Sequence, residues 1–159
     1  MRMNKENNVF LWLPCSVVFV GTAHGEQRDI MTATAMFVSE KEPLLAISVA
    51  QGHLTEKLID QSGNFTLVIA GHEHKQLAMQ VGSVKGDAED KFEKFKIQTE
   101  KTIGVPIPRD SAGWLECHVE SSHEIKGYRI FIGRVVNQED LKRPPLVWHK
   151  DGFFGLQPA

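Results

Sequence analysis

Cysteine and net charge are both scarce in this sequence of 159 residues. Its two cysteines, Cys15 and Cys117, stand far apart and match no metal-ligand spacing, which favours reduced, buried thiols and leaves a disulfide open. Eighteen basic and twenty acidic residues give a formal charge of -2, so nothing in the bulk charge favours nucleic acid or an anionic membrane as a partner. We therefore expect a cytoplasmic protein whose partner is a small molecule.

Long hydrophobic runs are also missing, since no segment reaches the roughly 20 apolar residues of a membrane span. The apolar segment Val9 to Val20 follows Arg2 and Lys5, which is the layout of a signal peptide. Glu6 and Pro14 interrupt that layout. An internal strand is therefore the favoured interpretation of this segment.

The two common glycine-rich nucleotide motifs are absent as well. The chain contains neither the G-x-G-x-x-G fingerprint of dinucleotide-binding folds nor the G-x-x-x-x-G-K-[ST] phosphate loop. Any nucleotide must therefore be held by another arrangement. With 42% hydrophobic residues, the chain is expected to form one domain over residues 1–159 with its own core.

The segment Pro43 to Ile59 predicts a strand that leads into a helix. Leu44 to Ala50 is a short apolar run, and Leu54, Leu58 and Ile59 recur at helical spacing. A glycine in the connecting turn can adopt backbone angles that other residues avoid, so the turn can point free N–H groups outward. The start of a helix attracts anions.

The same turn gathers side chains that suit a phosphate monoester. Ser48, His53, Thr55 and Lys57 add hydroxyl, imidazole and ammonium donors to the backbone N–H groups. The alternative is an ordinary turn in which Thr55 only caps the helix. The residues of the turn leave both interpretations open.

Hydrophobic patterning along the rest of the chain predicts short strands and two brief helices. The strands are expected at Ser16–Ala23, Asp29–Ser39, Phe65–Ala70, Trp114–Val119, Tyr128–Val136 and Leu146–His149, and the helices at His72–Val81 and Ala88–Phe95. The connector Gly104–Asp110 contains two prolines and cannot be a central strand. These elements favour a mainly β fold with short helices, built as a closed or nearly closed antiparallel barrel.

Two further features bear on ligands. The small residues Thr32 to Ala35 would let a flat ligand approach the backbone closely. His72 and His74 resemble a metal-binding pair, but side chains two residues apart diverge on a helix. We therefore predict no metal site.

Short motifs recur along the chain in a particular order and spacing. They are Val20-Gly21-Thr22-Ala23, Asp29–Ala33, Pro43-Leu44, Ile47-Ser48-Val49, His53-Leu54-Thr55, Gly63-Asn64-Phe65, Asp90-Lys91-Phe92, Leu115-Glu116-Cys117, Phe131-Ile132-Gly133 and Pro145-Leu146. With these motifs the chain resembles, over most of its length, the flavin reductase-like FMN-binding family. Members of that family fold as a split β-barrel and usually form homodimers.

The chain departs from the family pattern at three places. The family often has Asn where Asp29 stands, and Asn again where Val68 stands. It also often has Asp-His where Tyr128-Arg129 stand. These changes leave the expected fold intact, but they bear on the redox partner and the substrate.

The resemblance implies that FMN is the cofactor. In similar proteins one strand lies along the flavin ring and ribityl chain, and a later turn holds the phosphate. Carried over to the matching positions, the residues expected to bind FMN are Asp29, Ile30, Met31, Thr32, Ala33, Ser48, Val49, Ala50, His53, Thr55, Lys57, Lys91, Phe92 and His149. No catalytic side chain is implied.

Lys91 and Phe92 are placed near the flavin by the resemblance alone. A cation there would stabilise the negative charge that develops at the N1/O2 side of a reduced flavin and would raise its potential. Without the resemblance, the triplet Asp90-Lys91-Phe92 indicates an exposed short helix with one core Phe. Trp114 could stack on an aromatic ring and His149 could lie beside the nicotinamide, but a core tryptophan and a surface histidine remain equally open.

The function implied is hydride transfer from NADH or NADPH to FMN by a flavin reductase, with no covalent protein intermediate. The reduced flavin would then serve a partner oxygenase or another redox protein. One alternative is a flavoredoxin-like electron carrier with tightly bound FMN, and another is an FMN-binding module without redox turnover. The sequence leaves open the choice between NADH and NADPH and between FMN and FAD.

Overall fold

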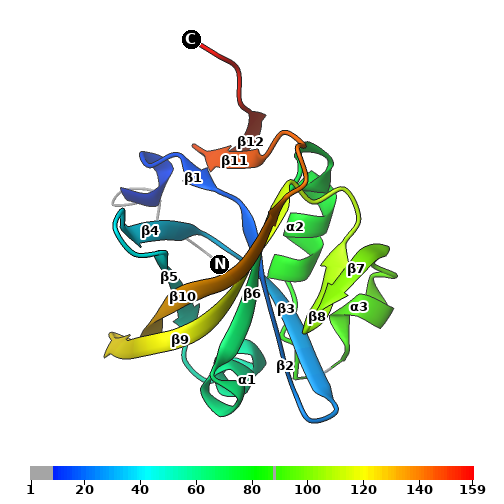
Figure 1. The fold of residues 1–159 in the computed structure, drawn as a ribbon. Helices are drawn as coiled ribbons and strands as arrows, with labels where there is room; N and C mark the ends of the chain where they lie inside the picture. Colours follow the sequence, from blue (N-terminus) through cyan, green and yellow to red (C-terminus); the bar gives the residue numbers. More distant parts are fainter. Residues whose placement is uncertain (1–8, 88) are drawn as a thin grey trace.

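A computed structural model of the chain describes residues 9–87 and 89–159. The strands form a seven-stranded sheet, a three-stranded sheet and a two-stranded ribbon, and every pairing is antiparallel (Figure 1). The Arg2 and Lys5 part of the signal-peptide interpretation lies outside the described residues. Of the apolar segment that follows, Val9–Leu11 form a 3₁₀ turn, and the predicted internal strand begins only at Cys15, where the chain enters the sheets as β1 and β2.

The seven-stranded sheet carries most of the fold. In spatial order its strands are β3 (Gln27–Ala33), β2 (Val18–His24), β6 (Asn64–Ile69), β9 (Gly113–Ile125), β10 (Tyr128–Asp140), β5 (Leu44–Ala50) and β4 (Ala35–Ser39). The three-stranded sheet contains β1 (Cys15–Ser16), β11 (Leu146–His149) and β12 (Gly152–Gly155), and the ribbon contains β7 (Thr99–Ile103) and β8 (Val105–Pro108). The helices are α1 (Leu54–Ser62), α2 (Lys75–Gly82) and α3 (Lys91–Lys94), with 3₁₀ turns η2 (Val9–Leu11) and η3 (His72–His74).

One residue joins the two edges of the large sheet. β3 and β4 are its outermost strands, yet only Thr34 separates them in the chain. The sheet must therefore curl until its edges meet, which makes a split antiparallel β-barrel. The expectation of one continuous strand over Asp29–Ser39 was wrong, because β3 pairs with β2 whereas β4 pairs with β5. The expected mainly β barrel is confirmed.

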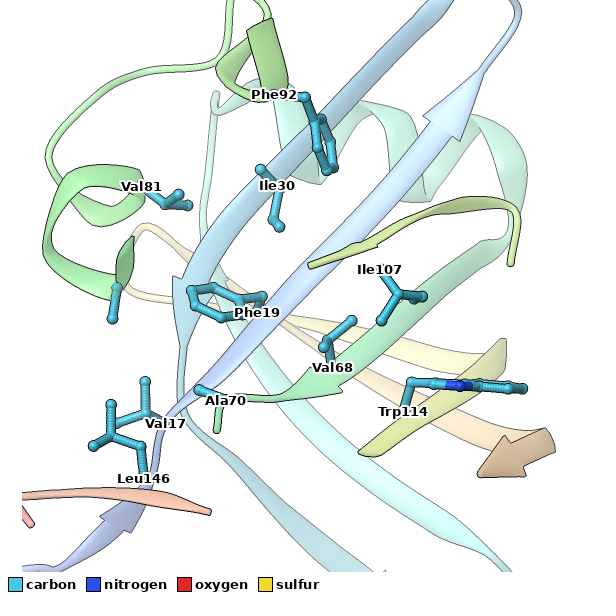
Figure 2. Close-up of a cluster of buried hydrophobic side chains, with 11 residues drawn as sticks. Val17, Phe19, Ile30, Val68, Ala70, Val81, Phe92, Ile107, Trp114 and Leu146 are labelled. Atoms are coloured by element: carbon cyan, nitrogen blue, oxygen red, sulfur yellow. The ribbon is translucent and has the colours of Figure 1, made fainter. Parts of the chain in front are cut away.

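Alternating side chains of β2 build two cores on opposite faces of the sheet. Val18 and Val20 point into the barrel, where they pack with Ile47, Phe65 and Phe131 among others. Phe19 points outward into a second cluster (Figure 2). Because both faces are covered, β2 reads as a nearly continuous apolar run rather than an alternating one.

Helices and the β7–β8 ribbon cover the outer core. Ala78 and Val81 of α2, Phe92 of α3 and Ile107 of β8 pack on the same cluster. The helix expected over residues 72–81 begins later, at Lys75, after the 3₁₀ turn. The helix expected over residues 88–95 is shorter, and Ala88 lies outside the described residues.

The proline-containing connector forms a strand, but an isolated one. β8 contains Pro106 and Pro108 and pairs only with β7 among the described residues. Proline is tolerated in such an edge position because no second neighbour needs its missing N–H. β7 was not predicted, since its sequence TEKTI carries few apolar residues.

The β9–β10 hairpin is much longer than the two predicted strands. A two-residue turn connects it, with φ of 48° at Lys126 and 83° at Gly127. Two consecutive positive φ angles are typical of the type I′ turn, whose twist matches that of the flanking strands. The hairpin crosses the barrel and brings its turn next to the end of β5.

Neither cysteine forms a disulfide. Cys15 is partly exposed and Cys117 is buried, and both are free. Burial, with a smaller contribution from Glu116, raises the pKa of Cys117 to about 12, so its thiol stays protonated. No helix among the described residues is long and apolar enough to cross a membrane.

His74 fastens the start of α2 to the turn between β8 and β9. Its Nδ1 accepts a hydrogen bond from the Gly71 N–H at 3.1 Å, and its Nε2 lies 2.6 Å from the Arg109 carbonyl oxygen. Both contacts together require the neutral imidazole with its proton on Nε2. Burial lowers the pKa of His74 below 6.5, with Arg143 adding to this effect and the Arg109 carbonyl, Asp110 and Glu100 opposing it.

We expect His74 to make folding less stable in mild acid. As pH falls below 6.5, the unfolded chain takes up a proton that the folded imidazole does not. The fold therefore loses about 1.4 kcal/mol of stability for each unit by which the pKa of His74 is lowered. Urea unfolding of the wild type between pH 7.5 and 5 should show this loss, and His74→Gln should remove it. His118→Gln, at an exposed position on β9, is the control, and an equal pH slope in wild type and His74→Gln would contradict the assignment.

Candidate functional site

The turn after β5 leads directly into the start of α1. Gly52 has φ of 83° and leads to His53, which is the N-cap residue of α1 and makes no side-chain capping bond. Interpreting Thr55 as the helix cap was therefore wrong, since it is the second residue of the helix. The Gly52 N–H is already engaged, because it donates to Glu56 Oε2 at 2.8 Å.

Several predicted phosphate donors share the surface of this turn. Ser48 and Lys57 are exposed, and His53 is partly exposed. Two other residues expected to bind FMN follow Ser48 on β5: Val49 is buried in the barrel core, and Ala50 is partly buried. The first backbone N–H groups of α1 add hydrogen-bond donors beside these side chains. This donor set suits a phosphate monoester.

A buried polar cluster ties β3, α1 and α3 together. Thr55 Oγ1 donates to Asp29 Oδ2 at 2.5 Å, and Lys91 Nζ lies 3.1 Å from Asp29 Oδ1. Lys91 also donates to the Ile30 carbonyl at 2.7 Å. The side chains of Asp29 and Lys91 are only 2% and 3% exposed. The structure thus brings together four of the predicted flavin-binding residues, but the side chains of Asp29, Thr55 and Lys91 contact one another, and Ile30 takes part through its carbonyl.

The loop between α2 and α3 closes over this cluster. A Cβ at Gly86 would lie 2.2 Å from Asp29 Oδ1, so only glycine allows the backbone to pass so near the carboxylate. Arg28 pairs with Asp90 at 2.8 Å, and its guanidinium carbon lies 4.7 Å from the centre of the Phe92 ring. Phe92 itself is buried in the outer core.

The end of β3 offers backbone rather than side chains. Thr32 Oγ1 donates to the Ala78 carbonyl at 2.6 Å, while Met31 and Ala33 pack on the barrel core. Because β3 is an edge strand, alternate backbone N–H and C=O groups point away from β2. Thr34, which follows β3, is exposed, and Ala35 at the start of β4 is partly buried.

Two predicted aromatic contacts lie elsewhere. Trp114 is buried, its Nε1 donates to Glu139 at 3.1 Å, and Lys101 Nζ lies 5.3 Å from its ring centre. His149 lies on β11, with its ring 6.4 Å from that of Phe154. Figure 1 places β11 at the opposite end of the barrel from α1, so His149 is not brought to the α1 turn.

A hollow that adjoins Leu54, the first residue of α1, is unsuited to phosphate. It has a volume of about 250 Å³, and its lining includes Glu26, Asp87, Glu89 and Asp90 against the single cation of Arg28. Four carboxylates repel an anion. Among the described residues no group of three or more His, Cys, Asp or Glu is arranged to hold a metal ion.

Comparison with known proteins identifies the family of this arrangement. Residues 12–157 match the family described as Flavin reductase like domain. The chain belongs to this flavin reductase-like family. It is 32% identical over 117 residues to the uncharacterized protein YddH of Escherichia coli K12, a match that covers 70% of this chain and 62% of YddH. It is 27% identical over 120 residues to the NADH-dependent flavin reductase StyB of Pseudomonas fluorescens, covering 76% of this chain and 67% of StyB.

Solved structures show the same flavin reductase-like fold. The NADH:FAD oxidoreductase SgcE6 of Streptomyces globisporus superimposes with a TM-score of 0.84 at 20% identity, over 95% of this chain and 90% of that one. The flavoredoxin of Methanosarcina acetivorans superimposes with a TM-score of 0.82 at 19% identity, over 100% and 93% of the two chains. At these identities the likeness concerns the fold.

Sequence reasoning missed two residues that contact the α1 turn or each other, Glu56 and Arg129. Glu56 bonds the Gly52 N–H, and its place three residues after His53 is the acidic position of a capping box, which was a readable signal. Arg129 lies 3.4 Å from Glu56 and also bonds Asp60, which is 69 residues away in the sequence. That partnership had no local signal, although Arg129 was already known to depart from the family pattern.

We expect loss of Lys91 to destabilise the fold because it leaves Asp29 as an unpaired buried charge. Lys91→Met should lower the free energy of unfolding by about 3 kcal/mol, measured by urea denaturation at pH 7. Lys94→Met, which removes an exposed lysine of the same helix paired only with Glu89, should change it by less than about 0.5 kcal/mol. Adding Asp29→Asn to Lys91→Met should recover part of the loss, and equal effects of the two lysine variants would contradict the pairing.

Proposed function

We propose that the chain binds FMN at the end of β3 and the α1 turn and acts as a NAD(P)H-dependent flavin reductase. The observation that carries the proposal is the Thr55–Asp29 hydrogen bond, which joins the strand expected along the flavin to the turn expected at its phosphate. These segments are 26 residues apart in the sequence. Family membership adds the flavin chemistry. The whole chain, residues 1–159, is proposed as one flavin-binding domain.

The residues of the α1 turn fit the charged end of the cofactor. Ser48, His53 and Lys57 would bind the phosphate together with the first N–H groups of α1, where the helix dipole favours an anion. Thr55 would fix the position of this turn through its hydrogen bond to Asp29 rather than contact the phosphate. FMN, when bound, accepts hydride from NADH or NADPH and passes the electrons on.

The edge of β3 fits the ring. Backbone groups of Met31 to Ala33 that do not pair with β2 are available to hydrogen-bond the polar edge of an isoalloxazine, and the small side chains that follow exclude little space. A ring bound against a strand edge keeps its other face open for a nicotinamide. The Lys91–Asp29 pair lies behind this strand and fixes its position.

The reductase proposal is tested by mixing the FMN-loaded protein with reduced nicotinamide in a stopped-flow instrument. NADH or NADPH alone should bleach the visible absorbance of the oxidised flavin, because hydride transfer needs no other protein. The control is the same mixing with free FMN at equal concentration. Bleaching that requires a reduced protein donor would instead support a flavoredoxin-like carrier, and failure of the protein to retain FMN would reject the site.

A homodimer is proposed through the edge strand β4. Met36 and Phe37 are adjacent, so they point to opposite sides of the strand, yet they are 67% and 68% exposed. Val38 is exposed as well. An edge strand with apolar side chains on both sides is a surface that proteins normally cover.

Charge on β4 should therefore break the dimer. Phe37→Glu should shift the sedimentation coefficient from the dimer to the monomer value, because a carboxylate is costly to bury. Met79→Glu, at an exposed apolar residue of α2, should leave the dimer intact. A wild type that sediments as a monomer at micromolar concentration would contradict the proposal.

The wider context is proposed from relatives. The Rhodococcus jostii relative HsaB, 25% identical over 122 residues, is described as the reductase subunit of a flavin-dependent monooxygenase. By analogy, the present chain would supply reduced flavin to a partner oxygenase or another redox protein in the cytoplasm. Neither nucleic acid nor membrane is proposed as a partner.

A further inference from the structure

Arg129 of β10 joins three carboxylates from two other elements. Its Nη1 bonds Asp60 of α1 at 2.7 Å, its Nη2 bonds Glu124 of β9 at 2.9 Å, and its Nε lies 3.4 Å from Glu56 Oε1. The guanidinium carbon also lies 5.7 Å from the centre of the Phe131 ring. With its side chain only 17% exposed, Arg129 is held in one place by these contacts.

Glu56 connects this arginine to the α1 turn. One carboxylate oxygen faces Arg129, and the other accepts the Gly52 N–H. A second link runs beside it, since the Gln51 N–H donates to the Gly127 carbonyl at 2.9 Å. The turn is therefore fastened to the β9–β10 hairpin at two points, and one of them passes through a charge.

The position of Glu56 creates an electrostatic conflict. It is the third residue of α1, so its carboxylate lies in the helix turn whose N–H groups would receive a phosphate. Two anions in the same turn repel each other unless a cation lies between or beside them. Arg129 is the cation in contact with Glu56.

We propose that Arg129 is a positioning residue which, although it is shared with Asp60 and Glu124, offsets part of the charge of Glu56 and holds it against the Gly52 N–H, so that the α1 turn accepts a phosphate. This role rests on the proposed function, in which that turn binds the FMN phosphate. Arg129 does not touch the phosphate itself. Its effect is specific to the charged end of the ligand, which distinguishes it from a side chain that only stabilises the fold.

The test compares FMN with riboflavin, which differs from FMN only by lacking the phosphate. Dissociation constants are measured by flavin fluorescence for the wild type, Arg129→Gln, Glu56→Gln and the double variant. Arg129→Gln should weaken FMN binding by about tenfold and riboflavin binding by less than about twofold, because only FMN meets the unneutralised carboxylate. The double variant should bind FMN within about threefold of the wild type.

Salt provides a second readout that a purely structural role would not change. The tenfold loss in Arg129→Gln should shrink when the ionic strength is raised to about 1 M, since the repulsion is then screened over about 3 Å. Arg129→Lys, which keeps the charge, should retain most of the preference for FMN. Glu56→Gln alone should not weaken FMN binding, and this variant keeps an acceptor for Gly52.

Arg134 is the matched control on the same strand. It also pairs with two carboxylates, Glu42 and Glu120, but both lie away from the α1 turn. Arg134→Gln should therefore leave the ratio of FMN to riboflavin affinity unchanged. If Arg129→Gln weakens the binding of FMN and of riboflavin equally, the proposed role is wrong. If Arg129→Gln does not fold, a tenfold loss of FMN binding in Glu56→Gln would show the same. A wild type without preference for FMN would instead reject the phosphate site, and the role of Arg129 with it.

Discussion

The single residue between β3 and β4 is the constraint on which the barrel depends. A chain that crosses from one edge of a seven-stranded sheet to the other within Thr34 can do so only if the sheet has curled until those edges adjoin. The seam formed in this way has unpaired backbone on β3 and small side chains around Thr34. It also lies next to β5 and therefore near the α1 turn, so closure of the barrel assembles the two halves of the proposed site.

The buried Asp29–Lys91 pair changes what a lysine at this position can do. A lone cation behind the flavin would pull strongly on the negative charge of the reduced ring. Here the carboxylate of Asp29 lies 3.1 Å from the ammonium group, so at the distance of the ring the two charges largely cancel. The neutral Asn that is common at this position in the family would leave the cation unopposed. At the proposed flavin site, Asp29 would thus limit the effect of Lys91 on the flavin, whereas the contacts of Lys91 with Asp29 and the Ile30 carbonyl fix β3.

Local patterns predicted some elements well and could not predict others. The strands Leu44–Ala50 and Leu146–His149 have the predicted bounds, because each is an apolar run between clear turn residues. The break at Thr34 carries no local signal, since alanine flanks it on both sides and the reason for the break is the closure of the whole sheet. In the site, the exposed donors Ser48 and Lys57 followed from the turn. The partners of Thr55 and Lys91 did not, since both depend on Asp29, which lies far away in sequence.

Glu56 places a carboxylate at the helix start where the chain is proposed to bind an anion. A carboxylate at this position has a physical explanation. Without a ligand, the carboxylate stabilises the first turn of α1 through the helix dipole and satisfies the Gly52 N–H. With a phosphate bound, the same charge would oppose the ligand. In the proposed role, Arg129 on the neighbouring hairpin would offset part of that opposition while leaving the bond to Gly52 in place, so the turn can be ordered before the ligand arrives. Preorganisation of this kind lowers the entropy lost on binding.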